Sequence, residues 1–347
     1  MEFLDVDGSL GEGGGQILRT AVSFSSILRR PVRVVNIRAG RDVPGLRRQH
    51  VSALEVLARV FGGELKGAEV GSSSITFAPG RQSVDSLSIN MGTAASITLV
   101  LQAVVPAVAL AHSRLSLELT GGTDVPWSPT FDYLQQVLRE AFSSVGINFE
   151  INARRRGYYP RGGGLVSAVI EPSRGVLPLD LTAEPRVPGA MLVSRCGHLP
   201  RHVAERQLAS ASDQLGRSGI KVLVAAVSEE QADSPGSSIL AYFTGNGGFI
   251  GGDSIGARGK PAEEVGSEAA ERFASAAASG ASVDSNLADM IIPLLSLAPK
   301  PSMVRVPRVT EHLRSGLLLA AQFTSCKWSE REEGRTTVVE VDPAGAR

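Results

Sequence analysis

The stretch RAGRDVPGLRRQH at residues 38–50 decides the fold, because its tripeptide DVP recurs in LTGGTDVP at residues 119–126. Each copy of the tripeptide comes just after an apolar segment that ends in glycine, VRVVNIRAG in one case and RLSLELTGG in the other. A helical pattern then follows each copy. The shared position of the tripeptide in two similar series of elements fixes the register of an internal repeat.

Working outward from this register, residues 3–80 are predicted to form a strand, a helix, a strand, a second helix and two closing strands. Residues 87–172 repeat that order, and a third copy is expected to begin near residue 283. Apolar residues recur at three- and four-residue steps in the helices, as in Leu54, Leu57 and Phe61, so one helix face can pack on a sheet. The pattern predicts an α+β fold in which each repeat lays two helices over a sheet.

The segment 182–280 does not fit the repeat and is predicted to be a smaller inserted α/β domain. The repeats would then form one catalytic domain from residues 1–181 and 281–347. Within the insert, GNGGFIGGDSIGARGK at residues 245–260 is expected to be a loop. It could form a lid over a ligand, but a solvent loop is favoured because mobile loops outnumber lids.

Composition limits the class of protein. Thirty-five basic residues balance thirty-five acidic ones, which argues against a protein that coats nucleic acid and leaves room only for a local basic groove. Cys196 and Cys326 are too few for a disulfide framework or a thiolate metal site, so a reducing compartment is expected. The N-terminus lacks a signal-peptide pattern, and no apolar run reaches membrane-spanning length. These features predict a cytoplasmic protein without membrane association.

A glycine-rich stretch, GEGGGQILRT at residues 11–20, leads into the first helical pattern. Glycines let the backbone approach an anion, helix N-termini present free N–H groups, and arginines such as those of residues 38–50 fit phosphate oxygens. We therefore expect a phosphate site, the alternative being a tight turn beside a solvated basic surface. A carboxylate there repels phosphate unless a cation lies between them, so Glu12 is a candidate metal ligand.

His312 stands where the third repeat's second helix should begin, just after the strand pattern VRVPRV. The arginine stretch 38–50 holds the corresponding position in the first repeat, so the two would converge if the repeats surround one cleft. An imidazole beside phosphate can act as a general base or as a nucleophile toward phosphorus. The alternative is a helix-cap histidine with local hydrogen bonds only. His198 and His202 lack a third ligand nearby and are expected at the surface.

Three further groups of residues each allow a structural and a functional interpretation. The run RRRGYYPRGGGLV at residues 154–166 interleaves arginine with tyrosine, which suits nucleic acid, but it can also form a hairpin whose arginines face water. Asp289 either stabilises a helix N-terminus or faces a ligand. Gln49 and Gln102 are either satisfied buried amides or ligand contacts.

The chain resembles the RNA 3'-terminal phosphate cyclase family over essentially its whole length. The resemblance is carried, in the family's order, by GEGGGQILRT, RAGRDVPGLRRQH, LTGGTDVP, RGYYPRGGG, PRHVAER, NLAD and TEHLRSG. The run from Arg156 to Leu165 also fits the family signature of arginine-glycine, proline three residues later and a glycine triplet. The resemblance implies three tandem repeats of a four-stranded sheet with two helices, as in the C-terminal domain of a bacterial translation initiation factor, plus a smaller inserted domain.

The resemblance also implies an activity, the ATP-dependent conversion of an RNA 3'-terminal phosphate into a 2',3'-cyclic phosphate. His312 would attack the α-phosphorus of ATP, with Mg²⁺ or Mn²⁺ present, and release pyrophosphate. AMP would then pass to the RNA 3'-phosphate, and the neighbouring 2'-hydroxyl would close the ring and release AMP. A homo-oligomeric state is left open.

By the same resemblance, Glu12 would hold the metal, and Arg19, Arg38, Arg41 and Gln49 would bind the phosphates of ATP and of the RNA end. Arg38 and Arg41 are assigned to the RNA phosphate. The expected nucleotide pocket contains Gln102, Pro129, Asp289 and Phe249. Two positions depart from the family pattern, Met290 where glutamine is usual and Asn286 where an aromatic can flank the adenine.

Two alternatives stay open from the sequence. One is a non-catalytic relative that acts in ribosome assembly, but such relatives lack the histidine that stands here at position 312. The other is an enolpyruvyl transferase, which uses similar repeats for anionic substrates. That class predicts lysines in a small-molecule site, whereas lysine is scarce in this chain.

Overall fold

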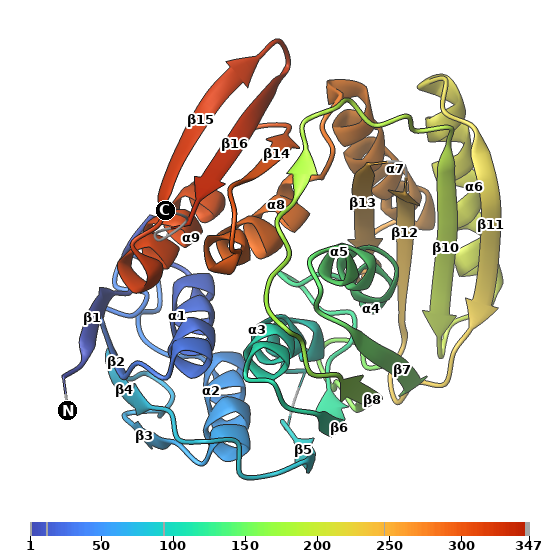
Figure 1. Cartoon of the computed structure of the whole chain (residues 1–347). Coiled ribbons are helices and arrows are strands. Elements are labelled where there is room, and N and C mark those ends of the chain that lie inside the picture. Colours follow the sequence, from blue (N-terminus) through green and yellow to red (C-terminus); the bar gives the residue numbers. More distant parts are fainter. Residues whose placement is uncertain (1, 12, 93, 246, 344–347) are drawn as a thin grey trace.

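A computed structural model describes residues 2–11, 13–92, 94–245 and 247–343. The described residues form four mixed sheets of four strands each, with helices packed against them (Figure 1). The predicted α+β class and its repeated units of sheet and helices are confirmed. No helix in these four ranges is long and apolar enough to cross a membrane.

The first two repeats have the same order of elements and the same sheet topology. The first contains β1 (Leu4–Asp7), α1 (Gly15–Leu28), β2 (Val32–Val35), α2 (Arg48–Phe61), β3 (Glu64–Lys66) and β4 (Ile75–Ala78), with sheet order β1-β2-β4-β3. The second contains β5 (Ser86–Asn90), α3 (Ile97–Leu110), β6 (Leu115–Gly121), a helix in segments α4 (Phe131–Tyr133), η1 (Leu134–Leu138) and α5 (Arg139–Ser144), then β7 (Phe149–Arg155) and β8 (Gly164–Ile170). Its sheet order, β5-β6-β8-β7, matches that of the first repeat.

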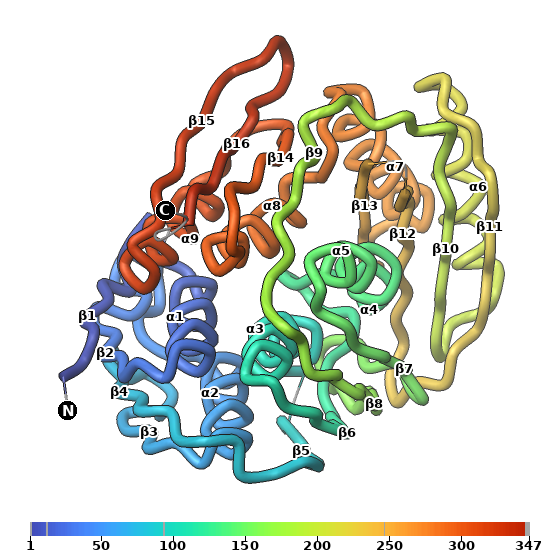
Figure 2. Tube along the Cα trace, viewed as in Figure 1, coloured from blue at the N-terminus to red at the C-terminus, as the bar shows by residue number. Residues whose placement is uncertain are grey.

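The third repeat begins earlier than its expected start near residue 283. Its elements are β9 (Asp180–Leu181), α8 (Ser285–Ile291), η2 (Ile292–Leu297), β14 (Ser302–Val306), α9 (Glu311–Thr324), β15 (Lys327–Glu333) and β16 (Thr336–Asp342). Strand β9 pairs in parallel with β14, as β1 does with β2, and Figure 2 shows the chain leaving and re-entering this sheet around the insert. A strand of two residues is too short to give a periodic pattern, which is why the sequence did not reveal it.

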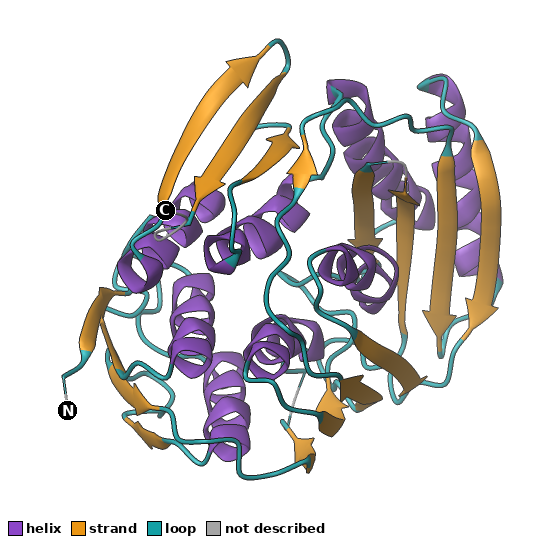
Figure 3. Cartoon of the chain, viewed as in Figure 1, coloured by secondary structure: helices purple, strands orange, loops and turns teal. Residues whose placement is uncertain are grey.

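Helices of the three repeats face one another in the centre of the molecule, and their sheets lie on the outside (Figure 3). Helix α1 contacts α2, α3 and α9. Because this helix is almost surrounded, even its serines are buried, and Ser23 Oγ donates to the carbonyl of Ala103 on α3 at 3.0 Å. One hydrophobic core joins all three repeats, so the cleft at their centre has rigid walls.

The insert consists of β10 (Ala190–Gly197), α6 (His202–Arg217), β11 (Val222–Glu229), β12 (Gly236–Gly245), β13 (Gly248–Ile255) and α7 (Ala262–Ser279). Its sheet, ordered β11-β10-β12-β13, has a hydrophobic cluster of its own with α6 and α7. We propose residues 182–280 as the bounds of this domain.

The loop expected at residues 245–260 was wrong over most of its length, since β13 occupies Gly248–Ile255 and pairs antiparallel with β12. Its glycines serve close packing rather than flexibility. A side chain at Gly251 would meet the ring of Tyr133, and one at Gly252 would meet the backbone of α7 at Ala269 and Phe273. Glycine here lets two layers approach the same sheet.

Candidate active site between the repeats

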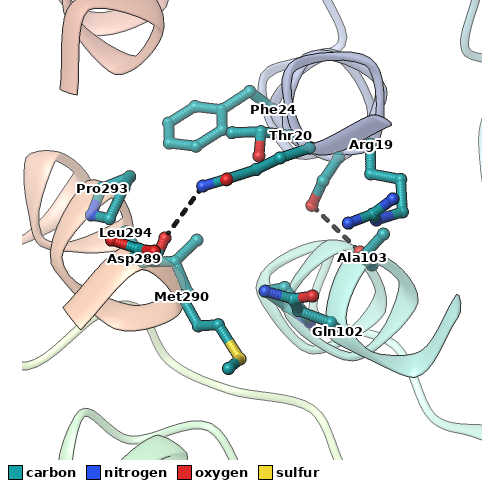
Figure 4. Close-up of a pocket in the computed structure, with 12 residues that line it drawn as sticks. Arg19, Thr20, Phe24, Gln102, Ala103, Asp289, Met290, Pro293 and Leu294 are labelled. Carbon is teal, nitrogen blue, oxygen red and sulfur yellow. Dashed lines mark hydrogen bonds between the residues drawn. The ribbon is translucent and has the colours of Figure 1, made fainter. Parts of the chain in front are cut away.

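A cleft lies where α1, α3 and the α8-η2 segment meet at the centre of the three repeats (Figure 4). Each repeat therefore contributes one wall. The lining residues are Gln16, Arg19, Thr20, Ser23, Phe24, Gln102, Ala103, Pro106, Asp289, Met290, Pro293 and Leu294.

The N-terminus of α1 opens toward this region. Its N-cap residue, Gly14, is extended, and no side chain in the described part of the chain caps the helix. A helix N-terminus of this kind is suited to present N–H groups to an anion. A β-carbon added at Gly14 would lie 3.7 Å from Arg41 Nη2 and 4.0 Å from His312 Cε1. The glycine turn, the arginine stretch and the histidine, which were expected to converge, therefore lie beside one another.

His312 lies in the first turn of α9, but it does not cap that helix. Thr310 is the cap, since its hydroxyl accepts the N–H of Leu313 at 2.9 Å. The same hydroxyl donates to Asp289 Oδ1 at 2.5 Å, which fixes α8 against the start of α9. His312 is therefore not the cap of this helix, and that part of the alternative interpretation is wrong.

Gln16 connects the α1 wall of the site to the third repeat. Its Nε2 lies 3.4 Å from the backbone oxygens of both Asp289 and His312. Sequence reasoning did not single out Gln16 or Thr310. Only the interruption of an apolar helix face by an amide could have signalled Gln16, and that signal is common.

Arg19 in the cleft lining and Arg38 beside it, together called the arginines of the cleft, lie in cationic surroundings. Desolvation lowers the pKa of the Arg19 guanidinium to about 10, which still leaves it charged at neutral pH. Burial and then the charges of Arg47 and Arg41 lower the pKa of Arg38. Arg38 Nη2 donates to the Val43 carbonyl at 3.3 Å, while its buried Nε has no partner among the described residues. An anion bound here would satisfy that donor and relieve the repulsion.

His50, which sequence reasoning did not single out, is the buried neutral member of this group. It is 1% exposed, and its Nδ1 accepts the backbone N–H of Arg47 at 3.1 Å. Desolvation and then the charges of Arg19, Arg38 and Arg47 lower the pKa of His50 to about 3. Its ring packs against Gly15, where a side chain would displace it. His50 thus supports the glycine turn without adding positive charge.

The remaining predicted site residues divide into two sets. Arg19, Gln102, Asp289 and Met290 line the cleft, and Pro129 is tied to its α3 wall because its carbonyl accepts Thr98 Oγ1 at 2.9 Å. Phe249 instead pairs with the backbone at Ser282 and Val283. The predicted residues that are not part of the lining are Gln49, Phe249, Asn286, Arg38, Arg41 and His312, of which Arg41 and His312 meet beside the cleft at Gly14. Glu12 lies outside the described residues.

Neither reading of RRRGYYPRGGGLV fully holds. Arg156 and Tyr158 are both 3% exposed, so neither can meet nucleic acid or water. Instead, Arg156 pairs with Asp124 at 3.3 Å and with Asp132 at 3.0 Å. Asp132 also pairs with Arg195 of the insert, which in turn pairs with Glu230. We call the set Asp124, Asp132, Arg156, Arg195 and Glu230 the junction, because it joins the second repeat to the insert.

His198 and His202 are exposed, as expected. Among the described residues, no three His, Cys, Asp or Glu side chains group closely enough to hold a metal ion.

In this repeated α+β fold, one arginine lines the central cleft, and an arginine and a histidine meet at a glycine turn beside it, an arrangement suited to an enzyme that handles phosphate. The family model described as RNA 3'-terminal phosphate cyclase matches residues 10–329. Relatives named RNA 3'-terminal phosphate cyclase are 40% identical in Caldivirga maquilingensis, over 99% of this chain and 99% of the relative, and 41% identical in Pyrococcus abyssi, over 92% and 93%. The chain belongs to the RNA 3'-terminal phosphate cyclase family, and the predicted enzyme class is confirmed.

A solved structure, the enolpyruvyl transferase NikO from Streptomyces tendae, covers 99% of this chain and 82% of its own, with 13% identity and a TM-score of 0.23. A likeness this low carries no argument about activity. The enolpyruvyl transferase alternative therefore gains nothing from it.

Proposed function

We propose that this enzyme uses ATP to convert an RNA 3'-terminal phosphate into a 2',3'-cyclic phosphate, with His312 as the nucleophile that carries AMP. The observation that supports this most directly is the meeting of His312, Arg41 and the uncapped N-terminus of α1 around Gly14. A phosphate placed over Gly14 would face a nucleophile, a fork-shaped donor and free backbone N–H groups together.

The reaction then has three balanced steps. An imidazole nitrogen of His312 attacks the α-phosphorus of ATP, and the bond to pyrophosphate breaks. An oxygen of the RNA 3'-phosphate attacks the same phosphorus and displaces the imidazole, which leaves AMP on the RNA end. The neighbouring 2'-hydroxyl attacks the RNA phosphorus, and AMP departs. Adenylylation supplies the leaving group, and the vicinal hydroxyl needs only orientation to close the ring.

The arrangement of cations supports the other roles in this proposal. Arg38 and Arg41 are suited to hold the RNA phosphate, and Arg19 with Gln102 and Asp289 lines the part of the cleft suited to the nucleotide. Pro129 would contribute from the loop held on α3. For Gln49 and Phe249 we keep the roles given by the family resemblance, in phosphate contact and adenine stacking respectively.

A divalent ion would be held largely by substrate oxygens and water. The described residues offer no three-ligand cluster, and Mg²⁺ is commonly bound through one or two carboxylates plus phosphates. Glu12 is the proposed carboxylate. Such an ion, Mg²⁺ or Mn²⁺, would neutralise charge on the phosphates of ATP.

The free, buried cysteines Cys196 and Cys326 suit a reducing compartment, and we propose the cytoplasm.

The decisive experiment is to incubate the protein with ATP labelled at the α-phosphate and a divalent ion, and then to measure label on denatured protein. We expect acid-labile, alkali-stable label that is absent in His312→Ala and unchanged in His202→Ala, whose histidine is exposed on α6. RNA with a 3'-phosphate should then yield the cyclic end, and RNA with a 2'-deoxy terminus should stop at adenylated RNA. Absence of label on folded protein that binds ATP would overturn the covalent mechanism and favour a non-catalytic role.

A further inference from the structure

Two large aromatic side chains of the second repeat stand in water. Trp127 is 95% exposed and Tyr159 is 66% exposed. Trp127 also has a φ of 67°, in the left-handed region that bulky residues rarely adopt. An exposed tryptophan on such a backbone does not stabilise the fold, so a role in binding a ligand is the explanation that we pursue.

The two aromatics come from adjacent backbone segments. The N–H groups of Thr123 and Asp124 both donate to the Gly157 carbonyl, at 2.8 and 3.3 Å, and Asp124 forms a parallel bridge with Tyr158. The two segments run parallel at this bridge, so Trp127, three residues beyond it, and Tyr159, one residue beyond it, are carried by neighbouring stretches of backbone. Buried Tyr158, against which Gly197 and Gly236 pack, anchors Tyr159 from behind.

The loop that carries Trp127 is fixed at both ends. Asp124 Oδ1 accepts the N–H of Phe131 at 3.2 Å, and Ser128 Oγ donates to the Val125 carbonyl at 2.8 Å. From the insert, Asp253 Oδ2 accepts the N–H of Thr130 at 2.8 Å. These bonds hold the backbone on both sides of Trp127, so little backbone freedom is left to lose when a ligand binds.

Exposed arginines lie close in the sequence to Tyr159. Arg161 is exposed two residues after Tyr159 and has no ion-pair partner among the residues that the structure describes. Arg154, also exposed, faces Glu118 across 3.7 Å, a weak pair at the surface. Aromatic faces beside arginines are the usual platform for single-stranded nucleic acid, since bases stack while the cations hold the backbone.

The platform lies close to the cleft. Thr98 Oγ1 donates to the carbonyl of Pro129, two residues beyond Trp127. On α3, Thr98 and the cleft residue Gln102 are four residues apart and share a face, with a rise of about 6 Å between them. The loop is thus anchored about one helical turn from the nucleotide end of the site.

We propose that Trp127 and Tyr159, with Arg161, bind single-stranded RNA by stacking on the bases just upstream of its 3' end. This surface, here called the stacking platform, rests on the proposed function for the identity of its ligand. It deepens that function by giving the enzyme a hold on the RNA chain that is independent of base identity, because every base has a face on which an aromatic ring can stack.

The test measures affinity for a short single-stranded RNA with a 3'-phosphate, by titration and by tryptophan fluorescence. Trp127→Ala should weaken binding about tenfold, while Trp127→Phe should stay close to the wild type because phenylalanine also stacks. The chain has two tryptophans, so Trp328→Phe, which changes the partly buried one on β15, is the matched control. RNA should quench the fluorescence of wild type and Trp328→Phe but not that of Trp127→Phe.

A second arm replaces the upstream nucleotides with abasic ones. The wild type should lose about tenfold in affinity, and Trp127→Ala should lose almost nothing more. Unchanged affinity in Trp127→Ala, quenching that persists in Trp127→Phe, or equal quenching by duplex RNA would each overturn the platform. Repeating the titration in the His312→Ala protein separates the two proposals. Binding that depends on Trp127 without any adenylate on the wild-type histidine would leave the platform standing and sink the proposed chemistry.

Discussion

The arginines of the cleft and those of the junction lie in opposite electrostatic surroundings. In the junction, Arg156 contacts two buried carboxylates and also lies 4.7 Å from the centre of the Phe131 ring. In the cleft, the charges that act most on Arg38 are those of other arginines. The pKa of Arg156 is accordingly raised by Asp132 and Asp124 against a large desolvation cost, whereas that of Arg38 is lowered. Buried Nε atoms without partners occur in both, so the carboxylates make the difference.

This comparison teaches how to separate structural from functional arginines. A guanidinium whose charge is neutralised by the protein contributes to the fold, whereas one whose charge is left for a ligand contributes to binding and costs stability. The two sets look alike in the sequence. Both follow glycine-rich or strand patterns and both occur in clusters, as in residues 38–48 and 154–161.

The largest expected effect comes from breaking the junction. Arg156→Met leaves Asp124 and Asp132 buried without their main partner, and we expect a loss of about 3–5 kcal/mol in the free energy of unfolding. Arg38→Met, the matched change in the cleft, should alter it by less than about 1 kcal/mol and instead abolish most RNA cyclisation. Chemical denaturation at pH 7 and a cyclisation assay measure both. Equal destabilisation by the two variants would remove the distinction.

The next largest expected effect is on the pH dependence of stability, through His50 beside the cleft. Burial and the nearby arginines lower the pKa of His50 from 6.5 to about 3 in the folded protein. Between these two pH values the unfolded chain binds a proton at this residue and the folded chain does not. Stability should therefore fall by about 3 kcal/mol from this group between pH 7 and pH 4. Denaturation of His50→Gln across this range should show a correspondingly shallower acid loss. A slope identical to that of the wild type would show that His50 is not the group responsible.

Asp284, beside the junction, should have the opposite pH dependence. Burial raises its pKa to about 6 from an ordinary 3.8, although the N–H groups of Leu287 and Gly251 and the hydroxyl of Tyr133 oppose the shift. The folded state then binds a proton first, so acidification from pH 7 to pH 4 should stabilise the fold by about 2–3 kcal/mol through this group. In Asp284→Asn that gain should vanish, which unfolding at the two pH values would reveal.

The smallest expected change in the free energy of unfolding comes from removing one hydroxyl group, that of Tyr133. Tyr133 Oη donates to Asp284 at 2.9 Å, linking the second repeat to the N-cap of α8. Tyr133→Phe should cost about 1–2 kcal/mol at pH 7 and less at pH 5, where Asp284 becomes neutral and the bond loses its charge. A cost that does not change with pH would mean that the carboxyl keeps one protonation state over this range.

Sequence reasoning reached the repeats and the convergence on His312 because both depend on local order. A tripeptide at equal places in two repeats is visible in one dimension, and so is a histidine at the start of a helix. Gln16 and Thr310 escaped because their roles depend on contacts with other repeats. The amide of Gln16, for example, bonds backbone atoms 273 and 296 residues away.

The errors have a common physical cause. Arg156 was given to ligand or solvent because its acidic partners, Asp124 and Asp132, lie in other segments of the chain. Gly251 and Gly252 were taken as flexible because the neighbours that require their small size, Tyr133 and α7, lie in other parts of the chain. In both cases, residues distant in the sequence decide whether a side chain is buried.

Strand β9 has a consequence for how the chain folds as it is made. The N–H of Leu179, the residue before this strand, donates to the hydroxyl of Ser302, 123 residues later, and the strand itself pairs with β14. The first two sheets contain only neighbouring segments and can close early during synthesis. The third sheet must wait until the insert has emerged, so the wall that carries Asp289 and His312 assembles last. A nascent chain therefore cannot perform chemistry at His312 before most of the enzyme has been synthesised.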